Sequence, residues 1–202
     1  MFLKVPQGMG VFIMNRRELI QNISLLLGGS IVGGSLFTST GCKSSDKQVN
    51  AMFTESQVAY LNEIADTILP ETSSPGAKAA KVGNFMALMV MDCYEEKDQK
   101  IFMQGLEKLD ELSDQKYNHS FVKITSVQRT ELLTALDKEQ KSFQNKKEKD
   151  APSHYFRMMK ELTLLGYFNS KEGATQALRY IAVPGKFDGS YPYKKGDKAW
   201  AT

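Results

Sequence analysis

The sequence from residue 54 to residue 70 reads TESQVAYLNEIADTILP, and it indicates how the chain folds. Thr54 and Gln57 have the spacing of a capping box, in which each side chain bonds the backbone N–H of the other residue at a helix start. Apolar residues then recur at gaps of three and four: Val58, Leu61, Ala65 and Ile68. This spacing places them on one helical face, and Pro70 stops the helix. The stretch predicts an amphipathic helix that buries one side.

Similar apolar stripes follow along the rest of the chain. They predict helices over about residues 82–93, 101–112, 125–143, 153–165 and 173–181. Thr125 and Gln128 repeat the capping-box spacing, and Pro184 ends the last of these segments. The sequence has no clear β-hairpin signal. We therefore predict an all-α fold, with a single compact domain of about five to six helices over residues 52–202 and an irregular, aromatic-rich tail.

Composition and charge exclude several classes of protein. The chain has 202 residues, of which 42% are hydrophobic, and this is ordinary for a globular protein. Three of its 26 basic and one of its 23 acidic residues precede Cys42, so the part from Cys42 onward carries a net charge of only +1. Nucleic-acid binding requires clustered Lys and Arg to displace counterions, so we expect no nucleic-acid partner.

Residues 1–41 have the organisation of a cleavable export signal. The adjacent Arg16 and Arg17 precede an apolar stretch over residues 20–37. A charged region followed by a weakly apolar region is typical of a signal peptide. Paired arginines indicate the twin-arginine translocase, which exports folded proteins.

The end of this signal predicts a lipid anchor. Residues 40–42 read TGC and resemble the end of a lipobox, in which the Cys42 thiol is acylated and becomes the new N-terminus. Residues 42–51 then form a tether to the domain. We expect the mature protein to be a membrane-anchored lipoprotein of the periplasm.

Some features depart from these patterns. Asn15 replaces the usual hydroxyl residue of the twin-arginine consensus, and Ser39 replaces the Leu of a lipobox. Met14 is a plausible natural start, with residues 1–13 a gene-start artefact. The alternative to a signal is a transmembrane anchor. A span requires about 20 mostly apolar residues, and residues 20–37 contain four glycines, each costing a helix roughly 1 kcal/mol. The anchor is the weaker interpretation.

Few residues carry recognisable chemistry. His119 and His154 have no Cys or carboxylate at metal-ligand spacing, so the sequence predicts no metal site. Cys93 lies on an apolar helical stripe, which favours a buried structural thiol over a reactive nucleophile. Asp66 is expected on a polar helix face, and charged faces are usually solvated. We predict neither catalytic residues nor a cofactor bound by this chain.

Two segments together resemble a known family. Residues 64–77 read IADTILPETSSPGA, and residues 165–170 read LGYFNS, continuing through Tyr180 to VPGKFDG at residues 183–189. With the Arg-Arg signal in front, this order resembles the gluconate 2-dehydrogenase subunit 3 family over about residues 52–193.

The resemblance implies an accessory role. Members of this family are small subunits of membrane-bound flavoprotein sugar and polyol dehydrogenases. The large subunit carries FAD and oxidises the sugar, and a cytochrome c subunit with c-type haem takes the electrons. The small subunit has no accepted catalytic residues and carries the export signal, with which the folded large subunit is thought to travel. The lipobox at Cys42 departs from many members.

The tail over residues 185–202 suggests a partner interface. It contains four large aromatic residues, Phe187, Tyr191, Tyr193 and Trp200, among glycines and Pro192. Such a segment cannot bury its own rings, and exposed aromatic clusters are unusual on a monomer. Either the rings fold back over the helical core, or part of the tail docks on the flavoprotein. Our hypothesis is an interface that includes Tyr191, Tyr193 and Trp200.

Two other functions remain open from the residues alone. One is a free-standing periplasmic lipoprotein whose helical domain binds another envelope protein or ligand. The other is an independent enzyme. A large flavoprotein gene next to this one would favour the subunit.

Overall fold

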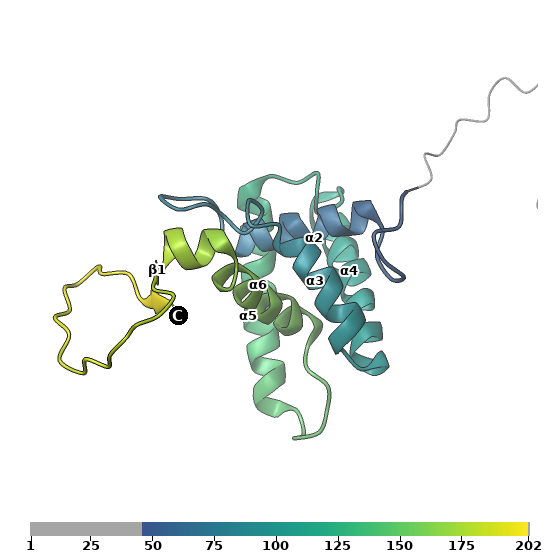
Figure 1. The fold of residues 1–202 in the computed structure, drawn as a ribbon. Coiled ribbons are helices and arrows are strands. Elements are labelled where there is room, and N and C mark those ends of the chain that lie inside the picture. The colour runs from purple at the N-terminus through teal and green to yellow at the C-terminus, as the bar shows by residue number, and fades with distance from the viewer. Residues whose placement is uncertain (1–45, 202) are drawn as a thin grey trace, which may run out of the picture. The chain divides into compact units, whose positions relative to one another are not determined.

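The computed structural model describes residues 46–201, so Arg16, Arg17 and Cys42 lie outside the described residues. This part contains five α-helices: α2 (Glu55–Ile68), α3 (Val82–Cys93), α4 (Glu96–Tyr117), α5 (Ser126–Lys146) and α6 (Tyr155–Phe168) (Figure 1). A short π-helix η1 (Gly173–Ala177) and two short strands, β1 (Arg179–Tyr180) and β2 (Trp200–Ala201), follow. Residues 46–201 are thus mostly helical, as predicted, and they include no helix with the length and apolar character of a membrane span.

The two predicted capping boxes form. At the start of α2, the Thr54 N–H donates to Gln57 Oε1 at 3.0 Å and the Gln57 N–H donates to Thr54 Oγ1 at 3.3 Å. Thr125 and Gln128 repeat this arrangement at the start of α5, with distances of 2.9 and 3.3 Å. Each box satisfies backbone donors that a helix start otherwise leaves without partners.

α2 packs against three of the other helices through one buried face. It contacts α3, α5 and α6, and its buried residues are Val58, Leu61, Ile64 and Ala65. α3 approaches α2 closely at Gly83, whose N–H donates to Asn62 Oδ1 at 2.9 Å. A Cβ on Gly83 would lie 2.7 Å from the Val58 carbonyl oxygen and from the Asn62 backbone nitrogen. The helices can reach this separation because position 83 has no side chain.

α6 packs against the other helices through its own small positions and those of its neighbours. Gly166 of α6 lies against the ring of Phe85 on α3, and Gly105 of α4 lies against the ring of Tyr155 on α6. The loop between α2 and α3 also contacts α6, because Tyr167 Oη donates to the Pro75 carbonyl oxygen at 2.6 Å. This loop belongs to residues 64–77, the first segment that carried the family resemblance.

Arg129 on α5 connects three parts of the chain. Its guanidinium donates to Glu63 Oε2 on α2 at 2.5 Å and, through Nε, to the Phe121 carbonyl oxygen at 3.0 Å. It also donates to the Val122 carbonyl oxygen. The Arg129 and Glu63 side chains are only 16% and 19% exposed, so the pair is less screened by solvent than a surface ion pair.

Residues at the end of the expected tether contact the helices. The Glu55 N–H donates to the Lys47 carbonyl oxygen at 2.8 Å. Asn50 accepts the Phe53 N–H at 2.8 Å and donates to the Ala87 carbonyl oxygen on α3 at 3.2 Å. The chain is therefore held against α2 and α3 from about residue 47 onward.

Three sequence-based expectations are wrong. Cys93 is exposed rather than buried, because α3 ends at this residue and carries its thiol beyond the core. The segment 173–181 is not a continuous helix, because η1 ends at Ala177 and the backbone becomes extended at Leu178 to form β1. The helix predicted over about residues 153–165 begins two residues later, at Tyr155, because the backbone of the N-cap His154 is still extended.

We expect Gly83→Ala to destabilise the helical domain. The added methyl group would overlap backbone atoms of α2, which cannot move as a side chain can, so α2 and α3 must separate. Overpacking of this kind lowers the free energy of unfolding by about 1–3 kcal/mol. Chemical denaturation measures the change, with Gly189→Ala as control because its nearest neighbour is the Phe187 side chain at 3.3 Å. Equal stability of the two variants would contradict the close approach.

Candidate functional site

The last described segment forms a closed arm. We call residues 179–201 the C-terminal arm; β1 and β2 pair in parallel at its base. The Arg179 N–H donates to the Ala199 carbonyl oxygen at 2.8 Å, and the Ile181 N–H donates to the Ala201 carbonyl oxygen at 2.9 Å. Figure 1 shows the arm as a yellow loop that leaves and returns at β1.

Arg179 gathers two of the three predicted interface residues. Its guanidinium carbon lies 3.6 Å from the ring centroid of Trp200 and 5.3 Å from that of Tyr191. The Tyr191 and Trp200 rings meet edge to face, with centroids 5.4 Å apart. A cation over an aromatic face is attracted by the ring quadrupole, by about 0.5–1 kcal/mol at an exposed site. Tyr193 takes no part in this cluster.

The arm does not cover the helical core. Every residue from 182 to 200 is exposed. Phe187 is 97% exposed and Tyr193 is 76% exposed. Of the two alternatives raised by the sequence, folding back over the core is therefore wrong, because the arm instead pairs with itself at its base.

Local hydrogen bonds give the arm a defined course. The Lys186 N–H donates to the Pro184 carbonyl oxygen at 2.8 Å. The Ser190 N–H donates to Asp188 Oδ1 at 3.1 Å, and the Lys194 N–H donates to Asp197 Oδ2 at 2.9 Å. The bond to Asp188 closes a turn in which the Asp side chain accepts the N–H two residues further on. The arm is thus a series of turns between two paired ends.

The C-terminal half of α6 carries a second exposed apolar feature. Leu164, Leu165 and Phe168 are 37%, 47% and 38% exposed. The apolar stripe that predicts a helix over residues 153–165 ends at Leu165 and implies that this residue is buried, which is wrong. A step of three residues from Leu162 rotates the side chain about 60° backward around the helix, whereas a step of four keeps Gly166 on the buried face.

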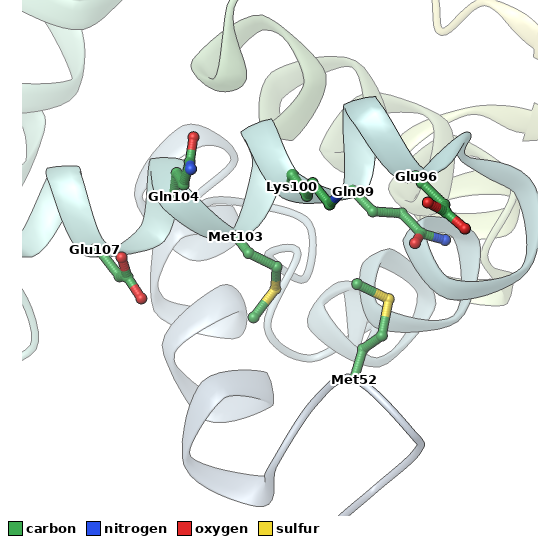
Figure 2. Close-up of a pocket in the computed structure, with 7 residues that line it drawn as sticks. All are labelled: Met52, Glu96, Gln99, Lys100, Met103, Gln104 and Glu107. Atoms are coloured by element: carbon green, nitrogen blue, oxygen red, sulfur yellow. The ribbon is translucent and has the colours of Figure 1, made fainter.

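A shallow hollow of about 440 Å³ lies along α4. Figure 2 shows its lining from α4, which carries Met103, on one side and Met52 on the other. The other lining residues are polar or charged: Glu96, Gln99, Lys100, Gln104 and Glu107. Among residues 46–201, no group of three or more His, Cys, Asp or Glu side chains is placed to hold a metal ion.

His154 has a structural role at the start of α6. Its Nδ1 accepts the Phe156 N–H at 3.2 Å, and its ring centroid is 4.4 Å from that of Tyr155. Only 8% of its side chain is exposed, and Nε2 lies 3.5 Å from Glu139 Oε1. Burial lowers the pKa of His154; the nearby Glu139 opposes this effect and Lys108 adds to it. The neutral ring is therefore the form that caps the helix.

Comparison with known proteins places this fold in a family. The family described as gluconate 2-dehydrogenase subunit 3 matches residues 55–185, from the start of α2 into the C-terminal arm. The chain belongs to this family, as the sequence motifs indicated. No curated protein and no solved structure matches the chain.

We expect the domain to lose stability as the pH falls through about 7 to 5. The unfolded chain protonates His154 near its ordinary pKa of about 6.5, whereas the folded chain resists protonation because the ring is buried. The unfolded state then binds more protons, so the free energy of unfolding falls with pH. Thermal unfolding measured across this range checks the direction.

His154→Asn is the matched variant, because Asn also caps helix starts well. This variant should flatten the pH dependence of the free energy of unfolding between about pH 7 and 5. An unaltered slope in His154→Asn would contradict the assignment.

Proposed function

We propose that this chain is the non-catalytic small subunit of an exported, FAD-dependent sugar or polyol dehydrogenase. In this proposal it carries the twin-arginine signal and assists the maturation, export and membrane association of the flavoprotein large subunit. The observation that supports it most is the family match over residues 55–185, since the family is described as a subunit of gluconate 2-dehydrogenase. A dehydrogenase partner follows from that description.

The proposed division of labour assigns the chemistry to other subunits. FAD belongs to the large subunit and c-type haem to a cytochrome c partner, while this chain supplies a folded binding surface. The polar clusters of the helical part fit this role because they join helices. Asp137 on α5, for example, bonds Lys141 of its own helix and Lys160 of α6, and these two lysines hold its pKa well below the usual range.

Glu63 shows the same pattern. Burial alone would raise its pKa, but hydrogen bonds from Lys78 and Arg129 outweigh burial and lower it. Both partners come from other segments of the chain: Lys78 lies in the loop before α3, and Arg129 lies on α5. The carboxylate thus links three segments of the fold, which is consistent with a packing role rather than general acid or base catalysis.

Affinity capture tests the proposal. The tagged chain, expressed in its native host, should retain a yellow flavoprotein whose bound flavin and sugar-dehydrogenase activity elute together. Capture of an envelope protein without flavin would instead support the free-standing lipoprotein. Turnover of a sugar by the purified chain alone would support an independent enzyme.

Replacing Arg16 and Arg17 by Lys should block export of both subunits. The substitution keeps the charge but removes the paired arginines that the translocase reads. Cell fractionation with antibodies against both subunits measures the effect, and Arg157→Lys, outside the signal, is the control. Continued export of the large subunit would show that it does not depend on this chain for transport.

Cys42→Ala should release the mature domain from the membrane. Loss of the acylated thiol removes the proposed anchor, and each buried methylene of an acyl chain contributes about 0.8 kcal/mol to membrane binding. Separation of membrane and soluble fractions checks this. Retention of the variant in the membrane fraction would favour a transmembrane anchor over residues 20–37.

A further inference from the structure

The charges of the chain are segregated between its helical part and its arm. Residues 46–178 contain 17 Lys and Arg against 20 Asp and Glu, a net charge of −3. The C-terminal arm contains five Lys and Arg against two Asp, a net charge of +3. The net charges of the acidic helical part and the basic arm cancel, so the net charge of residues 46–201 is zero. Segregated charge of this kind steers association with a surface of opposite sign.

Of the five basic residues of the arm, Arg179 stacks on Trp200, and the other four are lysines. None of the ion pairs among residues 46–201 includes an arm lysine. Lys198 donates to the Gln176 carbonyl oxygen at the base of the arm. Lys186, Lys194 and Lys195 are exposed in its turns. The two arm carboxylates, Asp188 and Asp197, accept backbone N–H groups there.

Apolar side chains stand exposed beside these lysines. Val183 and Phe187 are 80% and 97% exposed, and Tyr193 is 76% exposed. Aromatic side chains are enriched at the cores of protein interfaces, and Tyr is enriched among binding hot spots. Charges around such a core steer the association of the two partners. Solvation of so many large apolar side chains on a free arm is unfavourable unless a partner covers them.

The arm is also organised before any partner binds. Strand pairing closes its base, the Arg179 cluster packs Trp200 against Tyr191, and Asp-centred turns shape its course. Binding by an ordered segment loses less conformational entropy than binding by a flexible tail. The strand pair and the stacked cluster therefore hold the two ends of the arm together before a partner binds.

We propose that the C-terminal arm docks on an acidic surface of the dehydrogenase large subunit, with apolar pockets that receive Phe187 and Tyr193. This inference rests on the proposed function and names the surface through which it acts. An anionic membrane is the less suitable occupant, because Asp188 follows the most exposed ring directly and because the apolar side chains are distributed along the arm. The helical part, with a net charge of −3, has the opposite sign to the arm and is not expected to bind the same acidic surface.

Charge reversal in the full-length chain tests the electrostatic part. The triple variant Lys186→Glu, Lys194→Glu and Lys195→Glu changes the arm from +3 to −3, since each substitution removes a positive charge and adds a negative one. The matched control is Lys100→Glu, Lys123→Glu and Lys138→Glu, three exposed lysines of the helical part. Both variants have the same total charge.

The readout is dehydrogenase captured from the native host, measured as co-eluting flavin and sugar-dehydrogenase activity. We expect the arm variant to capture at most about one tenth as much enzyme as the wild type, and the control to capture nearly as much as the wild type. Raising the salt concentration from about 50 to 500 mM should weaken wild-type capture, because exposed charges are screened. Equal capture by the arm variant would overturn the docking surface and leave the proposed function standing. Failure of the wild type to capture a dehydrogenase would overturn both.

A photo-crosslinking amino acid at Tyr193 provides a test that does not depend on charge. Val127 on α5 is the matched control position, since both side chains are 76% exposed. We expect crosslinks from position 193, and not from position 127, to acidic segments of the large subunit. Crosslinks from 193 to a second copy of this chain would overturn the proposal. So would arm-dependent sedimentation with phosphatidylglycerol vesicles in place of crosslinks to the enzyme.

Discussion

The close approach of α2 and α3 at Gly83 is the constraint on which the helical packing depends. Backbone meets backbone there, and the Gly83 N–H is bonded by the Asn62 side chain. Because α2 also contacts α5 and α6, and because α3 contacts α6, the spacing at Gly83 determines where α6 can lie. The Phe85 ring then fills the space between α3 and α6, because Gly166 has no side chain there. A wider separation would leave cavities along this shared core.

Polar interactions complete this packing at places where apolar contacts alone would not specify it. Arg129 joins α5 to α2 and to the connector before α5, and Asp137 joins α5 to α6. The Tyr167 hydroxyl holds the α2–α3 loop on α6. These groups are partly buried and bonded, so they favour one arrangement of the helices over others. Because they join helices, Arg129 and Asp137 have a structural role.

The arm differs from the helical part in how it reaches stability. Its conformation depends on one strand pair, a cation–aromatic stack and turn hydrogen bonds, and its largest side chains remain in solvent. A segment with this character is suited to completing its burial in a complex. For a member of a dehydrogenase subunit family, the physical division is between a helical part that folds on its own contacts and a basic, aromatic arm that presents a surface.

The sequence alone determined the local features of this protein. Thr54 and Thr125 predicted the two capping boxes, and Pro70 predicted the end of α2. Tyr191 and Trp200 indicated an aromatic arm. These features could be predicted because helix caps, helix breakers and local composition act over only a few residues. Periodicity could not place Cys93 or Leu165, since the packing of neighbouring helices decides whether a side chain near a helix end is covered. Only the tertiary structure determined that Arg179 pairs with Trp200 across the two strands. It also determined that the Arg179 side chain lies against the rings of Trp200 and Tyr191. These contacts join residues far apart in sequence, so no local pattern encodes them.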